Sequence, residues 1–244
     1  MKIRRHILAV LMKKDVKLLL TNKNVLIMLL LPLGFSILYQ FIYADMMDED
    51  PDMIAFVLSI STLVNLCAIP LSGLGMMIAE EKEKHTLRVL MLNDVSALEY
   101  LLSKLLIVLC AMELVGILIF FVTKAPVGEL FTYLFATTIT SITLLLFGAV
   151  IGLISKDQMS TGTLSTPVMV FFLIPPMMGQ FNSFFQTIAQ LVPTYALTDM
   201  LNELMIGNSI FTQDMLPNYL LILAWTIIGI GVFCVMYKRK RFDN

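Results

Sequence analysis

The sequence predicts an all-α integral membrane protein, on three observations. Hydrophobic residues make up 58% of the 244 positions, charged residues 14%, and mean hydropathy is +0.86. A soluble globular chain carries about 25% charged residues, so this chain lacks the polar surface that a soluble domain needs. Six apolar runs have the roughly 20 residues that a membrane-spanning helix requires. Basic residues are concentrated beside alternate runs, and they form no soluble basic face. We therefore expect a lipid bilayer as partner and no nucleic acid.

The six apolar runs account for most of the regular structure. They cover residues 25–44, 53–79, 101–123, 130–154, 164–181 and 219–237. Because six spans of about 20 residues occupy roughly half of the chain, little remains for a soluble domain. We expect one transmembrane domain over residues 1–244. Pro175 and Pro176 stand near the end of the fifth run and predict a break and a bend there.

Charge distribution predicts the orientation. Of the 17 lysines and arginines, all but Lys124 lie in or directly beside the N-terminal segment, the second and fourth connections or the C-terminal tail. An even number of spans places these four segments on one side of the membrane, and basic residues mark the cytoplasmic side. Both termini are therefore predicted to be cytoplasmic, and the net charge of −1 hides a strong asymmetry between the two faces.

The N-terminal segment predicts an amphipathic helix on the inner membrane surface. Lys13 and Lys14 interrupt its apolar stretch, which argues against a cleaved signal peptide. The alternative is a simple basic flank that retains the first span. The apolar residues at helical spacing are Ile7, Leu8, Leu11, Met12, Val16, Leu19 and Leu20.

The long outer connection, residues 182–218, predicts a helical hairpin that dips into the outer leaflet and caps the bundle. Two sets of apolar residues recur at helical spacing, and Pro193 separates them. The alternative is a water-exposed loop. The first set is Phe184, Phe185, Ile188, Leu191 and Val192, and the second is Leu197, Met200, Leu201, Leu204 and Met205.

The inner connection after the second run carries a dense charge cluster, then a short apolar face of Leu87, Leu90 and Met91. A new helix follows, with Ser96 and Glu99 at the spacing of a capping box. A solvated loop is the alternative. A short amphipathic helix with charged edges is suited to a groove on a cytoplasmic partner.

This connection resembles the signature of type-2 ABC-transporter permeases, the membrane subunits of ATP-binding-cassette exporters. That family shows an acid-rich segment, Gly-Thr-Leu, a leucine-rich helix and a Gly-Lys pair that enters the third span. Here Thr86 and Leu87 follow the acids, His85 stands in place of the glycine, and Ser103–Lys104 stands at the Gly-Lys position. The sequence LVPTY at 191–195 resembles the family's Asn-Pro-Leu-Thr-Tyr stretch before the last span.

The resemblance implies a dimer of permease subunits, of identical or different chains, each docked to a separate ABC ATPase subunit. The chain contains no G-x-x-x-x-G-K-[ST] phosphate loop, so we expect no cofactor on this chain and ATP with Mg²⁺ on the partner. We expect a transport subunit and not an enzyme, because only His6 and His85 could serve a histidine-dependent site. The expected ATPase-coupling residues are Glu80, Glu81, Glu83, His85, Thr86, Leu87, Arg88, Leu90 and Met91.

Four polar residues inside the spans are candidates for a translocation pathway: Glu113, Asn65, Thr137 and Ser141. A carboxylate in lipid is costly, so Glu113 is expected to face the bundle or a watery cavity. It would contact cargo or serve as a hydrogen-bonded packing carboxyl. Thr137 and Ser141 share a helical face that also suits close packing. No residues are expected to bind a metal.

Few fixed charges in the spans favour an amphipathic or hydrophobic cargo, such as a peptide, a peptide antibiotic, a drug or a lipid-like molecule. The export direction follows from the resemblance, and we expect a bacterial cell membrane. The alternative function is an ion-coupled secondary transporter that works alone and uses Glu113 as its coupling site.

Overall fold

The computed structural model of the chain describes residues 4–49, 51–86, 90, 95–179 and 181–242, and within these residues it contains helices and no strand. Its elements are α1 (Arg5–Thr21), α2 (Lys23–Glu49), α3 (Pro51–Leu66), the π-helix η1 (Cys67–Gly73), α4 (Leu74–Glu83), α6 (Ala97–Val122), the 3₁₀ turn η2 (Val127–Glu129), α7 (Leu130–Ile154), α8 (Gln158–Met178), α9 (Ser183–Ala189), α10 (Pro193–Met205), the 3₁₀ turn η3 (Gln213–Met215) and α11 (Leu216–Phe242).

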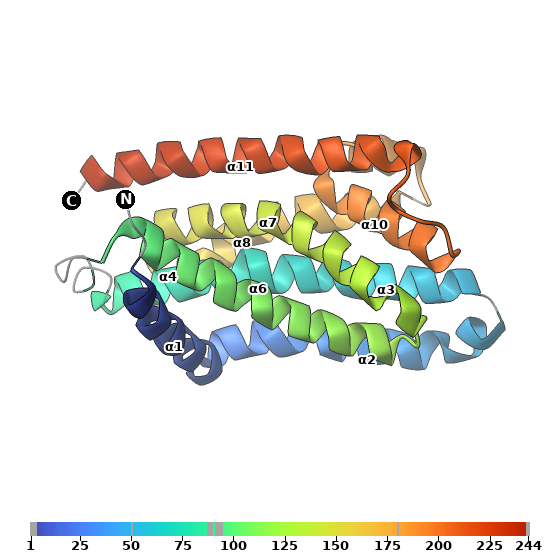
Figure 1. Cartoon of the computed structure of the whole chain (residues 1–244), viewed down its shortest axis with the longest axis horizontal. Coiled ribbons are helices and arrows are strands. Elements are labelled where there is room, and N and C mark those ends of the chain that lie inside the picture. The colour runs from blue at the N-terminus through green and yellow to red at the C-terminus, as the bar shows by residue number, and fades with distance from the viewer. Residues whose placement is uncertain (1–3, 50, 87–89, 91–94, 180, 243–244) are drawn as a thin grey trace.

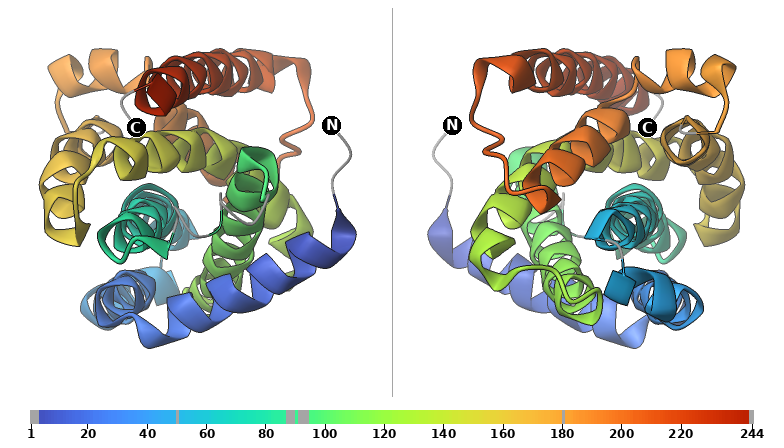
Figure 2. Two further views of the ribbon diagram at one scale, coloured as in Figure 1. Left: turned by 90° about the vertical axis from the view of Figure 1, so that its left-hand side faces the viewer. Right: turned by 90° about the vertical axis from the view of Figure 1, so that its right-hand side faces the viewer.

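The predicted six-span membrane protein is confirmed. Six helical segments are long and apolar enough to cross a membrane: Lys23–Met47, Asp52–Glu83, Glu99–Val122, Val127–Ile154, Gln158–Met178 and Gln213–Tyr237. They form one elongated bundle, and both chain ends lie at the same end of it (Figure 1). We call this end, which is predicted to be cytoplasmic, the inner end. Helix α1 runs obliquely across it, along α2 and α6 (Figure 2).

The second span is the centre of the bundle. It is built from α3, η1 and α4 in unbroken succession, and it packs against α2, α6, α7, α8 and α10. In its most apolar stretch 89% of the residues are buried, against 17% in the first span and 11% in the last. A displacement of α4 would therefore change the packing of most helices in the bundle.

A π-helical segment, η1, lies in the middle of this central span. Pro70 has no backbone N–H and cannot continue the α-helical hydrogen-bond ladder, so the helix widens there. The wide backbone lies so close to α7 that a Cβ on Gly148 would stand 2.2 Å from the Pro70 carbonyl oxygen. One turn later, a Cβ on Gly152 would stand 2.9 Å from the Gly75 oxygen. The Gly148–Gly152 pair is therefore a close helix-packing motif.

Helix α8 differs from the sequence expectation at both ends. It begins at Gln158, because Asp157 and Ser160 form a capping box that the apolar run could not reveal. The expected break at Pro175 and Pro176 is wrong. The helix continues through both prolines to Met178, and the Gly179 N–H donates to the Pro175 oxygen at 2.8 Å.

The predicted outer hairpin consists of α9 and α10. Four members of the second apolar set, Leu197, Met200, Leu201 and Leu204, are buried in α10, and Met205 is half-buried. Helix α10 packs on α3, α7, α8 and α11 at the outer end. The first set is not buried as a face. In α9, Phe184 is exposed, and Leu191 behind it is exposed as well, while Val192 is fully buried. Helix α9 therefore presents Phe184 outward from the bundle, next to α8.

Large apolar side chains cover the outside of the bundle, as expected where lipid is the solvent. The residues on α2 include Ile27, Leu30, Ile37, Leu38, Phe41 and Ile42, and those on α11 include Leu220, Leu223, Ile227, Ile228, Ile230 and Val235. Two helices at opposite sides of the bundle are thus free to contact lipid or another subunit.

Candidate functional site

Four charged side chains meet where α1, α4 and α6 converge at the inner end. We call Lys14, Asp15, Glu81 and Lys104 the inner ion cluster. Lys104 Nζ donates to Asp15 Oδ1 at 2.8 Å and to Glu81 Oε1 at 3.0 Å. Lys14 pairs with Glu81, and its Nζ lies 3.6 Å from Asp15 Oδ1. The cluster therefore holds two cations and two anions and is neutral as a unit.

The inner ion cluster is buried. Lys104 and Asp15 are fully shielded from solvent, and Glu81 is 4% exposed. Ser103 Oγ donates to Asp15 Oδ2 at 2.7 Å, and the Lys104 ammonium lies 5.1 Å from the centre of the Tyr100 ring. Removal of one partner of a buried ion pair is strongly destabilising, because it leaves the other charge uncompensated. The cluster thus holds α1, α4 and α6 in one arrangement.

A second ionic contact ties α1 to α6. The Arg4 guanidinium donates to both Glu99 oxygens, from Nε at 3.0 Å and from Nη2 at 2.9 Å. Glu99 also completes the predicted capping box, because Ser96 Oγ accepts from the Glu99 N–H at 3.2 Å and the Ser96 N–H donates to the Glu99 carboxylate at 3.0 Å. One carboxylate therefore begins α6 and fixes the start of α1 to it.

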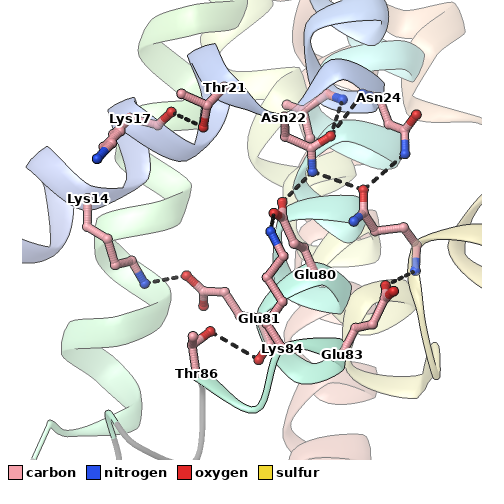
Figure 3. A network of polar contacts seen from close by, with 12 residues as sticks. Lys14, Lys17, Thr21, Asn22, Asn24, Glu80, Glu81, Glu83, Lys84 and Thr86 are labelled. Atoms are coloured by element: carbon pink, nitrogen blue, oxygen red, sulfur yellow. Dashed lines mark hydrogen bonds and ion pairs between the residues drawn. The ribbon is translucent and has the colours of Figure 1, made fainter.

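A third set of polar contacts surrounds the joint between α1 and α2 (Figure 3). Asn22 Nδ2 donates to Glu80 and, at 2.9 Å, to Gln158 Oε1. Its Oδ1 accepts from the Asn24 N–H at 2.8 Å and so caps α2. Lys84 pairs with Glu80, and this hydrogen bond and charge raise the pKa of Lys84 above its ordinary value. The joint is therefore bonded to the end of α4 and the start of α8.

Lys82 connects α4 to the end of α7. Its Nζ donates to the Leu153 oxygen at 2.7 Å and to the Ser155 oxygen, at the C-terminus of α7. Unpaired carbonyls at the end of a helix carry partial negative charge, so a cation there is favourable. At the inner end, α4 is thus bonded to α1, α6 and α7.

The turn after α4 has an unusual backbone. His85 has a φ of 56°, which is the left-handed region, and its N–H donates to the Lys82 oxygen at 3.0 Å. Glycine is the usual residue in this position because it has no Cβ. His85 stands at the place where the type-2 permease signature has glycine. This chain therefore has a left-handed backbone at that place although the residue is histidine.

The predicted coupling residues fall into three groups. Glu80 and Glu81 are buried in contacts with this chain's own helices, so they do not lie on an open surface. Glu83, His85 and Thr86 are exposed, and Leu90 is half-buried. Leu87, Arg88 and Met91 lie outside the described residues. The exposed part of this set is the turn that follows α4.

The predicted pathway residues lie in a separate polar group, in the middle of the spans. Glu113 of α6 accepts from Thr138 Oγ1 at 2.8 Å and from Thr137 Oγ1 at 3.1 Å, both on α7. Asn65 Nδ2 donates to the Met112 oxygen at 3.1 Å, one residue from Glu113 along α6. Ser141 Oγ donates instead to the Thr138 oxygen of its own helix at 2.8 Å. The structure thus brings Glu113 and Thr137 together, with Asn65 on the neighbouring α3.

Sequence reasoning missed several members of these groups. Asp15 was not singled out, although it lies between two buried leucines, Leu11 and Leu19, at spacings of four. An acid on the apolar stripe of a helix requires a buried cation, and this signal could have identified it. Thr138 and Gln158 carried no such signal, because their partners come from distant segments. Among the described residues, no group of three or more histidines, cysteines or carboxylates could hold a metal ion.

A bundle of six membrane-spanning helices, with a buried ion pair between α1 and α6 at its inner end, defines a multi-pass membrane protein. The family model described as ABC-2 family transporter protein matches residues 46–236. The chain therefore belongs to the ABC-2 transporter family, and it is a membrane permease whose family works with an ABC ATPase. A comparison with curated proteins finds no match.

Proposed function

We propose that this chain is the permease subunit of an ATP-driven exporter in a bacterial cell membrane. A separate ABC ATPase subunit binds ATP with Mg²⁺ and docks at the inner end, and a second permease subunit, identical or different, completes the pathway. The cargo is amphipathic or hydrophobic: a peptide, a peptide antibiotic, a drug or a lipid-like molecule.

One observation carries this proposal: the segment between α4 and α6 is anchored to α1 on both sides. Before it, Glu81 is bonded to Lys14 and to Lys104. After it, Glu99 is bonded to Arg4. A partner that moves this segment moves the ends of α4, α6 and α1 together, because the carboxylates of Glu81 and Glu99 are buried and are bonded across these elements.

The central position of α4 supports the next step. Since α3, η1 and α4 are continuous and surrounded by the other spans, a push at the inner end of α4 reaches the mid-span level of the bundle. Packed helices respond by shifting as rigid elements. Glu113, Thr137, Asn65 and Ser141 lie in three of those helices, α6, α7 and α3, and in our proposal they line the pathway.

The exporter proposal is tested by reconstitution. The chain is purified with a candidate ABC ATPase subunit and placed in proteoliposomes, and transport of fluorescent amphipathic probes is measured with ATP and with a non-hydrolysable analogue. ATP-dependent movement is the expected result. Movement driven by a proton or sodium gradient with no ATPase present would favour the ion-coupled carrier with Glu113 instead.

A further inference from the structure

A cleft of about 210 Å³ opens between α1 and the end of α4. Its polar lining comes from α1 on one side and from α4 and the turn after it on the other (Figure 3): Lys14, Lys17 and Thr21, and Glu80, Glu81, Lys84 and Thr86. A single water needs only about 10–15 Å³ of such space, so the cleft is large enough for a polar group with its hydration.

The cleft offers more ammonium donors than it has acceptors to satisfy them. Glu80 and Glu81 are each already bonded, to Lys84 and Asn22 and to Lys14 and Lys104 respectively. Each ammonium carries three N–H donors. Within the described part of the chain no acceptor is in reach of Lys17 Nζ, and Lys84 has one carboxylate partner.

The net charge of the cleft lining is positive. Lys14, Lys17 and Lys84 contribute three positive charges to the lining and Glu80 and Glu81 two negative charges, which leaves one positive charge in excess. The neighbouring Lys104 and Asp15 cancel each other. One monovalent anion would therefore neutralise the cleft, and its oxygens would accept the donors that remain.

The position of Lys17 on α1 indicates where such an anion comes from. Val16 and Leu20, beside it and one turn on, are exposed apolar residues at 42% and 59%. On an amphipathic surface helix, exposed apolar residues contact acyl chains, and adjacent lysines stand at the level of the headgroups. Anionic lipids of the cytoplasmic leaflet attract basic residues at that depth.

We propose that this cleft binds the phosphate of one anionic phospholipid, with Lys17 and Lys84 as the principal donors and with acyl chains along Val16 and Leu20. The bound lipid would bridge α1 and α4 at the inner end. This inference needs only a membrane-embedded chain and does not depend on the exporter assignment.

The test uses native mass spectrometry of the full 244-residue chain in non-ionic detergent, without ATPase or nucleotide. Short-chain phosphatidylglycerol, short-chain phosphatidylcholine and inorganic phosphate are titrated separately. We expect phosphatidylglycerol to bind at one site per chain and the other two ligands to bind at least fivefold more weakly. Lys17→Gln should weaken phosphatidylglycerol binding about fivefold, and Lys17→Arg should restore it.

The matched control is Lys13→Gln, which removes the same charge from an exposed position of α1 outside the cleft. It should change the affinity less than twofold. An equal loss in Lys13→Gln and Lys17→Gln would mean general surface attraction and would overturn the site. Equal binding of inorganic phosphate would overturn the lipid assignment, and a Lys17→Gln variant that keeps full phosphatidylglycerol affinity would overturn the site.

Discussion

Lys104 Nζ lies 2.8 Å from Asp15 Oδ1, and both side chains are fully buried although they are 89 residues apart in the sequence. The pair joins a helix that lies across the inner end to a helix that spans the membrane. Glu81 binds the same ammonium from the central span, so a single nitrogen connects three elements. The first prediction tests this connection.

Lys104→Met should lower the free energy of unfolding by about 3–5 kcal/mol, because it leaves two buried carboxylates with one half-exposed lysine. The double variant Lys104→Met/Asp15→Leu should recover most of that loss, because Lys14 and Glu81 then remain as a neutral pair. Unfolding in detergent, followed by tryptophan fluorescence, measures both. Lys13→Met is the exposed control and should change stability by less than about 0.5 kcal/mol. A double variant no more stable than the single one would contradict a compensated ion cluster.

Gly148→Ala should destabilise the protein by about 1–3 kcal/mol, because the added methyl group cannot fit between α7 and the π-helical segment without moving one of them. The Pro70 carbonyl oxygen would stand 2.2 Å from it. Gly231→Ala is the control: it is also helical, and nothing lies within 4 Å of its added Cβ. The control should be neutral or stabilising by up to about 1 kcal/mol. Equal unfolding midpoints for the two variants would show that the close approach imposes no constraint.

His85→Gly should stabilise the protein by about 1 kcal/mol, since a left-handed backbone costs a residue with a Cβ roughly that amount. The φ of 56° at this position is the basis. His85→Ala separates backbone from side chain, because alanine keeps the Cβ and loses only the imidazole. Equilibrium unfolding should therefore place the alanine variant with the wild type. If alanine stabilises as much as glycine does, the imidazole and not the backbone is the source of strain.

Glu99→Gln should weaken the stimulation of the ATPase partner by this chain if the proposed function is right. The amide can still cap α6, but it loses the charge that holds Arg4. We expect a several-fold drop in the partner's stimulated ATPase activity, with unchanged membrane insertion. Leu87→Asp and charge reversal at Arg88 should act in the same direction. Glu203→Gln, on the outer hairpin, is the control. Full stimulation in Glu99→Gln would remove the Arg4–Glu99 contact from the mechanism.

Glu113→Gln should leave ATP-driven transport within about threefold of wild type, because the Gln oxygen can still accept from Thr137 and Thr138. Glu113→Leu should cost more, since both hydroxyls then lose this partner. Transport rates in proteoliposomes measure the two variants side by side. Complete loss of transport in Glu113→Gln, together with a lost dependence on an ion gradient, would support the ion-coupled carrier instead.

Local signals in the sequence were reliable wherever neighbouring residues decide the structure. The apolar runs predicted six spans, and the Ser96–Glu99 spacing predicted the start of α6. The buried face of α10 also followed from spacing alone. Local reasoning was wrong at Pro175 and Pro176, because the helix that surrounds them continues without the two missing N–H groups.

The sequence by itself determined that the chain is embedded in a membrane, how many times it crosses the membrane and which segments lie on the same side of it. These properties depend on the length of the apolar runs and on the distribution of basic residues along the chain, and both act directly on insertion into a bilayer. Only the tertiary structure decided that the second span is central, that Asp15 belongs with Lys104, and that Glu80 and Glu81 turn inward. Those facts depend on which residues distant in sequence meet in space. A buried charge is stable only beside an opposite charge, and local sequence patterns do not show which distant residue provides it.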